Sequence, residues 1–434
     1  MSVHSQKHQR YGEDTDTLRP RNIGQSSFGR SVRSILVIAP YLSRKFSGTA
    51  HVAINTINAL ARSTETEIHV ATFLVDDGVI PADIQVSLLA HRPERRGVWR
   101  IGRAFALDDC ESVLLAASLP VVDMMFTQSL EMAAAYAKLF PDTHIVSHLG
   151  HVIGSREALL DSSLGWPWKQ VDAYLSNVHE ALFYNLPNLT HVVSTQLVAE
   201  QRSRHFKIAA STFHVQPLGI ETHQFSDRSA RDRTRERIGI DPSGCLIVTV
   251  SRLVKWKNTA WLIRAMRKLP GNVHLAIVGD GPEKAALTES VDAQICDRVH
   301  VIGHDTPVDW LAAGDIFALP SQIESFGMAY AEAMCMGLPC IGLRNSPPAV
   351  LSSAQDVICP GPGGIVVSDE QELVEALRVL VSDPKRRREM GAYSSAWAMR
   401  HYTQERYAKF LEQRLAATIS ARAATQARTY VVRE

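Results

Sequence analysis

The sequence is poor in three features that identify many proteins at a glance: paired cysteines, long apolar runs and an excess of one charge. Its six cysteines are scattered over 434 residues with no Cys-x-x-Cys pair. This argues against a disulfide framework or a zinc site and favours free thiols in a reducing compartment. No stretch reaches the roughly 18 uninterrupted apolar residues of a membrane span, and residues 1–33 contain no apolar signal-peptide core. We therefore expect a cytoplasmic protein with a disordered N-terminal tail over residues 1–33.

The charge balance argues against a strongly basic or acidic protein. Forty-six Lys and Arg residues face forty-five Asp and Glu residues, so the net charge of +1 gives no global reason to expect nucleic-acid binding. Basic residues concentrate in residues 91–103, HRPERRGVWRIGR, around Trp99. This segment is either a solvated basic loop or a contact for an anionic acceptor or a membrane surface, so peripheral membrane contact stays open.

Short apolar runs rich in β-branched residues alternate with helical patterns, first over residues 34–216 and again over residues 227–395. The strand-like runs are residues 34–40, 68–75, 121–128, 143–150 and 190–196, then 245–253, 273–281, 298–304 and 316–321. This alternation predicts an α/β fold with two Rossmann-like domains, each built on a parallel sheet. We expect an interdomain linker at residues 217–226, and over residues 396–434 a helix that packs back on the first domain, with a frayed end.

Ligands of open α/β sheets bind beyond the carboxyl ends of the strands, so two facing domains predict an active-site cleft between them. The most informative sequence near such an end is PSQIESFGMAYAEAMCMGLP, residues 320–339. It ends a strand, turns through Ser325, Phe326 and Gly327, and continues from Met328 as a helix rich in Ala and Met. Backbone N–H groups at a helix start that contains glycine can bind an anionic ligand, so we expect a diphosphate sugar here.

Two carboxylates, Glu324 and Glu332, flank this turn eight positions apart. If the chain between them is mostly helical, their backbones lie about 12 Å apart at ~1.5 Å per residue. Two carboxylates that share one glycosidic bond lie roughly 5 to 9.5 Å apart, so the spacing argues against a glycosidase pair. It suits two contacts to one long ligand, with Glu324 at a sugar and Glu332 at ribose hydroxyls, unless Glu332 is an ordinary solvated helix residue.

Residues at other strand ends extend the candidate site. Arg252 and Lys257 follow the first strand of the second domain, where they would neutralise a leaving diphosphate unless they belong to a solvated basic loop. Gly279 and Gly281 form a turn in VGDGPEK, a steric role that glycine also fills without a ligand. Lys284 breaks the G-x-G-x-x-G dinucleotide pattern, which argues against an NAD-dependent oxidoreductase.

The first domain offers two further candidates. Gly48 lies in the loop after the first strand-like run, ahead of a helical pattern. His148 ends the apolar run of residues 143–150 and is expected to face the cleft, with His151 close behind. A lone histidine among seventeen is more often structural than functional, so position alone supports His148.

In combination, the second-domain elements resemble family 4 of the glycosyltransferases, which are retaining enzymes of the GT-B fold. Glu324 to Glu332 resembles the family's Glu-x7-Glu signature, inside a closely similar strand, turn and helix. Arg252 and Lys257 fall where the family has its diphosphate-binding Arg and Lys, five positions apart, and VGDGPEK resembles the strand and turn that follow.

The resemblance is looser in the linker and the first domain. PLGIE, residues 217–221, resembles the family's interdomain phrase, with Glu221 in place of the usual Asp. Gly48 stands between Ser and Thr, where the family commonly carries a pair of glycines. His148 matches a histidine that is frequent in the acceptor-side domain of the family.

The resemblance implies retaining transfer of a sugar from a UDP- or GDP-sugar to a hydroxyl acceptor through a loose, oxocarbenium-like transition state. The donor's own phosphate would help to deprotonate the acceptor, and cationic side chains would replace a metal, so neither metal nor cofactor is expected. The catalytic residues would be Glu324, Arg252, Lys257 and His148. The donor-binding residues would be Glu332, Ser325, Phe326, Gly327, Met328, Gly279, Gly281 and Gly48.

Two other functions stay open at this point. One is a catalytically silent GT-B subunit that binds a nucleotide or a protein, and the other is a GT-B phosphorylase. The donor's base, its sugar and the acceptor depend on variable loops and do not follow from the sequence.

Overall fold

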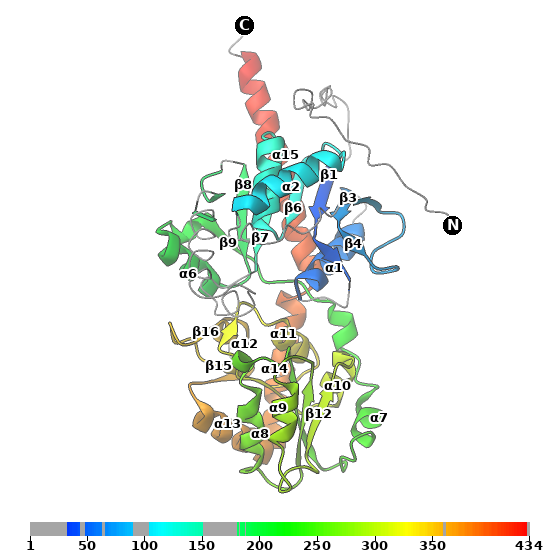
Figure 1. Ribbon diagram of the computed structural model, residues 1–434, viewed down its shortest axis with the longest axis vertical. Helices are drawn as coiled ribbons and strands as arrows, with labels where there is room; N and C mark the ends of the chain where they lie inside the picture. Colours follow the sequence, from blue (N-terminus) through cyan, green and yellow to red (C-terminus); the bar gives the residue numbers. More distant parts are fainter. Residues whose placement is uncertain are drawn as a thin grey trace, which may run out of the picture.

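The computed structural model describes residues 33–43, 48–62, 66–89, 104–150, 180–181, 183–186, 188–358 and 362–431. Two parallel sheets, of seven and six strands, occupy the two ends of an elongated molecule and are flanked by helices (Figure 1). The predicted α/β fold with two parallel-sheet domains is therefore confirmed. The exact domain boundaries stay a prediction.

The N-terminal sheet has the strand order β5-β3-β1-β6-β7-β8-β9, and each of its pairings is parallel. Its inner strand β1 (Arg33–Ile38) reads RSILVI and is buried along nearly its whole length, as expected of a parallel strand covered on both faces. The remaining elements are β2 (Tyr41–Leu42), α1 (Gly48–Ala61), β3 (Thr66–Thr72), β4 (Leu74–Val75), β5 (Gln85–Leu88), α2 (Ala104–Ala116), β6 (Met124–Thr127), α3 (Leu130–Leu139), β7 (His144–Leu149), β8 (Leu189–Val193), α6 (Gln196–Phe206), η2 (Ala210–Thr212) and β9 (Phe213–Val215).

The C-terminal sheet has the order β12-β11-β10-β13-β15-β17 and is also parallel throughout. Its first half consists of η3 (Thr222–Phe225), α7 (Arg231–Glu236), β10 (Cys245–Val250), η4 (Lys255–Lys257), α8 (Thr259–Met266), β11 (Val273–Val278), α9 (Lys284–Glu289), β12 (Val299–Gly303) and α10 (Pro307–Ala313). The second half consists of β13 (Ile316–Leu319), β14 (Ile323–Glu324), α11 (Met328–Cys335), β15 (Cys340–Leu343), β16 (Leu351–Ser352), α12 (Ala354–Ile358), β17 (Gly364–Val367), α13 (Glu370–Ser382), α14 (Pro384–His401) and α15 (Gln404–Val431).

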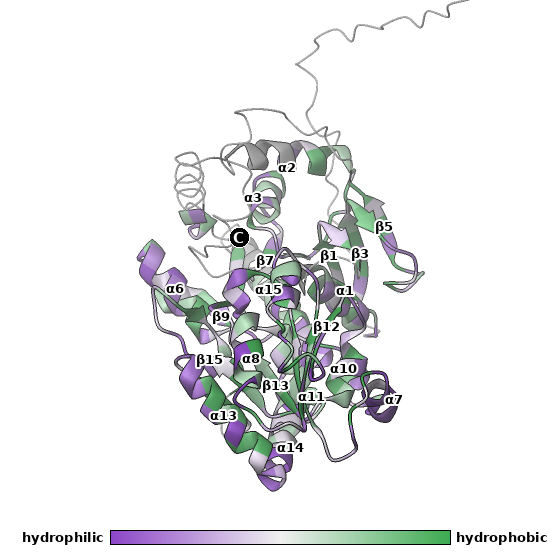
Figure 2. Ribbon diagram, turned by 60° about the horizontal axis from the view of Figure 1, so that its bottom comes forward, coloured by the Kyte–Doolittle hydropathy of each residue, from purple (hydrophilic) through white to green (hydrophobic). Residues whose placement is uncertain are grey.

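The apolar side chains lie inside the two layered domains and continue between them. In Figure 2 the peripheral helices α6 and α7 carry much purple, so they present hydrophilic residues to the outside. One buried cluster contains residues of β1, α1, α10, α11 and α15, so it runs from one domain into the other. No described helix is long and apolar enough to cross a membrane.

The chain passes twice between the domains, and the two passages touch. Ile220 N donates to Tyr402 O at 2.8 Å, and Ile220 pairs with Thr403 in a parallel bridge. A side chain at Gly219 would place its Cβ 2.8 Å from the Cα of Gln404, so only glycine permits this approach. From this junction α15 runs along α1, and Leu411 and Leu415 are fully buried. The C-terminal helix is thereby part of the N-terminal domain's core.

Candidate functional site

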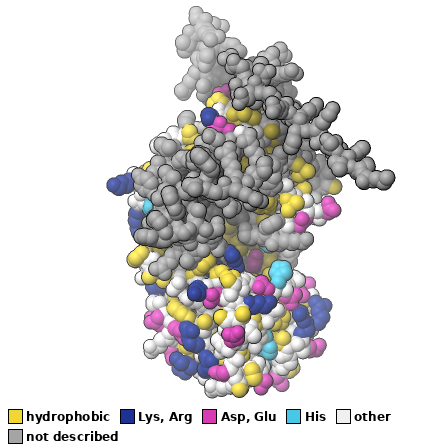
Figure 3. All heavy atoms as spheres, in the orientation of Figure 1, with side chains coloured by type: hydrophobic (Ala, Val, Ile, Leu, Met, Phe, Trp, Pro, Cys, Tyr) yellow, Lys and Arg dark blue, Asp and Glu magenta, His cyan; other side chains and the backbone are white. Residues whose placement is uncertain are grey.

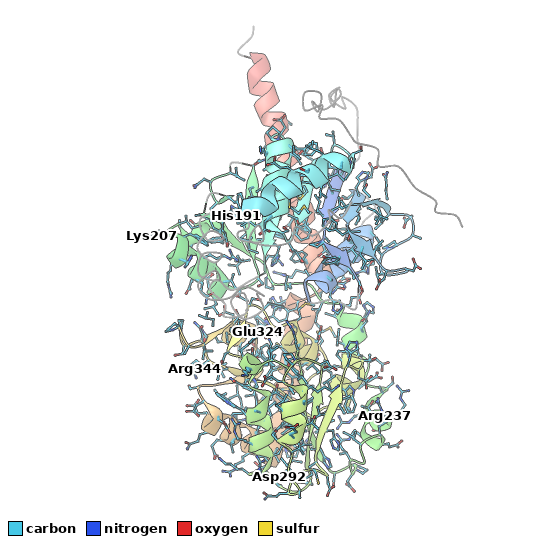
Figure 4. All side chains as sticks on the ribbon, in the orientation of Figure 1. His191, Lys207, Arg237, Asp292, Glu324 and Arg344 are labelled. Carbon is cyan, nitrogen blue, oxygen red and sulfur yellow. The ribbon has the colours of Figure 1, made fainter. Side chains whose placement is uncertain are left out.

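The candidate residues of the second domain gather at one edge of its sheet. The segments after β10, β11 and β13 leave the sheet at its carboxyl edge, because parallel strands all end at the same side. Figure 4 places Glu324, which ends β14, at the junction of the two domains. The sequence elements predicted for a donor site therefore lie on the side that faces the N-terminal domain.

Lys257 and Glu324 form one ion pair. The Nζ of Lys257 donates to Oε2 of Glu324 at 2.7 Å, and the two side chains are only 15% and 14% exposed. Lys257 sits in η4, whose position is fixed because Gln322 N donates to Trp256 O at 2.7 Å. The ring of Trp256 also packs against Ile323. The two segments therefore hold a partly buried cation and a partly buried carboxylate in contact at the sheet edge.

The turn before α11 requires glycine. Gly327 has φ +77°, and a Cβ there would lie 2.5 Å from the ring of Tyr330. The helix begins at Met328, so the N–H groups of Met328 and Ala329 have no acceptor within the helix and can serve an anionic or hydroxyl ligand, whereas Tyr330 N already donates to Gly327 O at 2.8 Å. The ring of Phe326 is buried and packs edge-on against Tyr402 at 5.4 Å, so only its backbone can serve a ligand.

Glu332 lies within α11 and is partly buried, and burial raises its pKa to about 7. The expectation that the chain between Glu324 and Glu332 is mostly helical is wrong for the first part of this segment. Glu324 ends a strand, residues 325–327 form a turn, and the helix starts only at Met328. The separation of about 12 Å inferred from ~1.5 Å per residue therefore does not describe this pair.

Gly279 and Gly281 have a steric role that the structure explains. Ser251 N donates to Val278 O at 3.0 Å, so the segment after β10 runs against the segment after β11. A Cβ at Gly279 would lie 1.9 Å from Ser251 O, and one at Gly281 would lie 2.4 Å from Leu253 O. The two glycines let this contact form, and the contact fixes the backbone that carries the exposed Arg252. Their contact with a donor stays a prediction.

His148 is the next-to-last residue of β7, as expected of a residue near the strand end, but its side chain is buried. It lies within β7, is 1% exposed, and burial lowers its pKa to about 3, so the imidazole is neutral. Its Nδ1 lies 2.5 Å from the hydroxyl of Tyr407 in α15. Its Nε2 has no hydrogen-bond partner in the described part of the chain.

Two further predictions fall elsewhere. Gly48 is the first residue of α1 and not part of a loop. His151 and the whole basic segment 91–103 lie outside the described residues.

Sequence reasoning missed a contact between the domains beside the turn at Ser325. Thr195, at the start of α6, donates its Oγ1 to Ser325 O at 3.1 Å and lies 2.9 Å from the hydroxyl of Ser353. Leu197 N donates to Oδ2 of Asp356 at 2.9 Å, so a carboxylate of one domain caps a helix of the other. Ser194-Thr195 before an apolar run is a readable helix-cap signal, whereas the partners across the junction are not readable from sequence.

Neither the surface charge nor the arrangement of possible metal ligands indicates a second site among the described residues. On the face shown in Figure 3, the described Lys and Arg side chains of the lower domain are interspersed with Asp and Glu. Among the described residues, no group of three or more His, Cys, Asp or Glu side chains could hold a metal ion. The cationic groups at the candidate site are Arg252 and Lys257.

Comparisons with known proteins agree with this arrangement. Residues 230–397 match the family described as glycosyl transferases group 1. The chain is 28% identical over 242 residues to a D-inositol 3-phosphate glycosyltransferase of Xylanimonas cellulosilytica, covering 52% of this chain and 57% of that protein. It is 30% identical over 226 residues to a GDP-mannose-dependent monoacylated alpha-(1-6)-phosphatidylinositol monomannoside mannosyltransferase of Corynebacterium glutamicum, covering 48% and 58%. The chain thus spans a little over half the length of these relatives.

Solved structures match over more of the chain. Anabaena HepE in complex with UDP and glucose superimposes with a TM-score of 0.65 at 18% identity, covering 88% of this chain and 99% of that one. Sucrose-phosphate synthase from Thermosynechococcus elongatus gives a TM-score of 0.70 at 18% identity, covering 90% and 100%. At these identities the likeness concerns the fold. The chain therefore has the two-domain GT-B fold, and its residues 230–397 match glycosyl transferases group 1.

Proposed function

We propose that this protein is a retaining glycosyltransferase that moves a hexose or N-acetylhexosamine-type sugar from a UDP- or GDP-sugar to a hydroxyl acceptor. The observation that carries the proposal is the partly buried Lys257–Glu324 pair, 2.7 Å apart, beside the start of α11. A cation, a carboxylate and helix N–H groups at one sheet edge are what a sugar diphosphate requires. Relatives whose names specify glycosyl transfer, one of them GDP-mannose-dependent, support it.

The ion pair suggests how the donor enters. Without donor, Glu324 neutralises Lys257. A bound diphosphate brings at least two negative charges, so it competes with Glu324 for the ammonium group, and Arg252 supplies the second cation. Glu324 is then released to accept hydrogen bonds from hydroxyls of the donor sugar. Lys257 thereby contacts the diphosphate, and Glu324 contacts the sugar, on the two sides of the bond that breaks.

The chemical step follows from these positions. The bond between the anomeric carbon and the diphosphate oxygen breaks, and its electron pair stays on the diphosphate, which Arg252 and Lys257 stabilise. The acceptor oxygen forms its bond to the same face of the anomeric carbon and passes its proton to a diphosphate oxygen. The protein supplies position and charge, so no metal is needed. Glu332 would accept hydrogen bonds from the ribose hydroxyls of the nucleotide.

Calorimetry and thermal shift against UDP, GDP, ADP and dTDP, with and without magnesium, test this function. We expect one nucleotide to bind with an affinity that magnesium leaves unchanged, and its sugar conjugate to release nucleoside diphosphate when acceptors are supplied. Release of sugar phosphate would indicate a phosphorylase. Tight nucleotide binding without turnover on any acceptor or on water would indicate a silent GT-B subunit.

A further inference from the structure

A short two-stranded sheet carries Glu324, and it is separate from the six-stranded sheet of the same domain. Its strands β14 and β16 pair in parallel over only two residues each. Leu351 N donates to Gln322 O at 2.7 Å. Ser353 N, just after β16, donates to Glu324 O at 2.9 Å. An isolated pair of strands is marginally stable at best, so the backbone of Glu324 depends on what else holds β16 in place.

The N-terminal domain supplies part of that support through the hydroxyl of Thr195. This buried hydroxyl lies 3.1 Å from Ser325 O, 2.9 Å from the hydroxyl of Ser353 and 3.4 Å from Val198 N. A hydroxyl has one hydrogen and two lone pairs. Because a carbonyl only accepts, the Thr195 hydrogen goes to Ser325 O, and its lone pairs accept from Ser353 and from Val198 N. Thr195 therefore has no bond left for a ligand, and it acts on the turn and on β16.

Asp356 in α12, the helix that follows β16, makes a second connection to the N-terminal domain. Its Oδ2 accepts from Leu197 N in the first turn of α6 at 2.9 Å. The free N–H groups and the dipole at a helix start favour a carboxylate there. Asp356 N also donates to Ser353 O at 2.9 Å, so the capping residue is joined directly to the end of β16. Figure 1 shows β16 and α12 at the end of the lower domain that faces the upper one.

Both connections from α6 meet at Ser353, the residue that holds the carbonyl of Glu324. We propose that Thr195 and Asp356 are positioning residues that dock α6 against β16 and α12 and thereby hold the strand that carries Glu324. The effect on sugar transfer rests on the proposed function, whereas the coupling between the α6 contact and the β14–β16 pair is a property of the protein alone. The N-terminal domain thus supports a carboxylate of the candidate donor site without touching the donor.

Hydrogen exchange of the Ser353 amide tests the coupling without any substrate, because its bond to Glu324 O lies within the C-terminal domain. Asp356→Ala removes the cap on α6 but no bond of the β14–β16 pair. We expect it to raise Ser353 exchange about tenfold, because the pair opens more readily. Asp383→Ala is the matched control, since Asp383 caps α14 of the same domain through Arg386 N at 2.9 Å, and exchange should stay within about twofold of wild type. Unchanged Ser353 exchange in Asp356→Ala would overturn the proposal.

Two substitutions of Thr195 separate its hydroxyl from its packing. Thr195→Val removes the hydroxyl at nearly the same size, and Thr195→Ser keeps it. We expect Thr195→Val to raise Ser353 exchange about tenfold, and Thr195→Ser to stay within about twofold of wild type. Ser129→Ala is the control for the loss of a helix cap, because Ser129 caps α3 of the same domain through Met132 N at 3.2 Å. Equal Ser353 exchange in Thr195→Val and Ser129→Ala would show that the hydroxyl does not hold β16, and this would refute its positioning role.

Turnover separates the positioning role from a stabilising one. We expect kcat to fall about tenfold in Asp356→Ala and Thr195→Val, to recover in Thr195→Ser and to stay within about twofold in Asp383→Ala, because a displaced carboxylate slows the chemical step. Equal losses of kcat in Asp356→Ala and Asp383→Ala would reduce Asp356 to a helix cap and refute the proposal. A wild type that transfers no sugar would refute the transferase function, and the coupling would then still stand on the exchange of the Ser353 amide.

Discussion

Replacing Lys257 by alanine tests the ion pair at the centre of the site. The substitution leaves the carboxylate of Glu324, which is 14% exposed, without the ammonium group 2.7 Å away. Breaking a fully buried pair costs about 3–5 kcal/mol of unfolding free energy, and the residual exposure places this pair nearer about 2–3 kcal/mol. Removing a charge that stabilises the leaving group should lower kcat by about 10²–10³.

The neighbouring Lys255 provides the control. It lies in the same 3-10 turn but is exposed, so Lys255→Ala should change the unfolding free energy by less than about 0.5 kcal/mol and leave kcat within about twofold. Urea denaturation measures stability, and steady-state release of nucleoside diphosphate measures kcat. The double variant Lys257→Ala, Glu324→Ala should lose less stability than the sum of its single variants, because neither charge is then left alone.

Two results would refute this reasoning. A Lys257→Ala protein with wild-type kcat would show that the leaving diphosphate does not depend on Lys257. Additive stability losses in the double variant would show that Lys257 and Glu324 do not interact in solution as they do in the structure. A loss of kcat equal in Lys255→Ala and Lys257→Ala would point to the net charge of the turn instead of the pair.

Three other substitutions test the surrounding parts. Because burial raises the pKa of Glu332 to about 7, its carboxylate should ionise late in the folded protein. The unfolding free energy should then fall, and the nucleotide affinity should rise, as pH rises from about 4.5 to 7. In Glu332→Gln, the pH dependence of the unfolding free energy, measured by denaturation, and that of the nucleotide affinity, measured by calorimetry, should both become flatter. Gly327→Ala should lower the unfolding free energy by about 1–3 kcal/mol more than Gly337→Ala does, because both glycines have positive φ but only a Cβ at Gly327 would lie against a ring. Equal losses of unfolding free energy in urea denaturation would contradict this. Asp356→Ala should raise hydrogen exchange of the Leu197 amide about tenfold, since the cap between domains is lost; unchanged exchange would show that the cap is not formed in solution.

The sequence predicted the layered architecture because buried parallel strands leave a strong local signal. Runs such as β10, CLIVTV, and β11, VHLAIV, are short, apolar and rich in β-branched residues. The strands β15, CIGL, and β17, GIVV, escaped prediction because each has four residues and contains a glycine, so neither stands out from the adjacent loops. Register and strand order depend on tertiary pairing and had no readable signal.

The candidate site divides in the same way. The turn and helix of residues 325–335 could be predicted, because glycine at a strand end followed by Ala and Met encodes them locally. The pairing of Lys257 with Glu324 joins residues 67 positions apart, and the bond between His148 and Tyr407 joins residues 259 positions apart. Such contacts depend on how the domains pack, so the sequence indicated the residues but not their partners.

The contact between the domains and the turn proposed for donor binding, residues 325–327, share Ser325. The carbonyl of Ser325 accepts a hydrogen bond from Thr195 of the other domain at 3.1 Å, and the next residues lead into the N–H groups at the start of α11. A ligand that holds this turn in place must favour the contact with Thr195 if the contact requires the same backbone position. By thermodynamic reciprocity, contact between the domains then raises the affinity for that ligand by the same factor. If a donor binds at residues 325–328 as proposed, the hydrogen bond between Thr195 and Ser325 O would make its affinity depend on how the two domains meet.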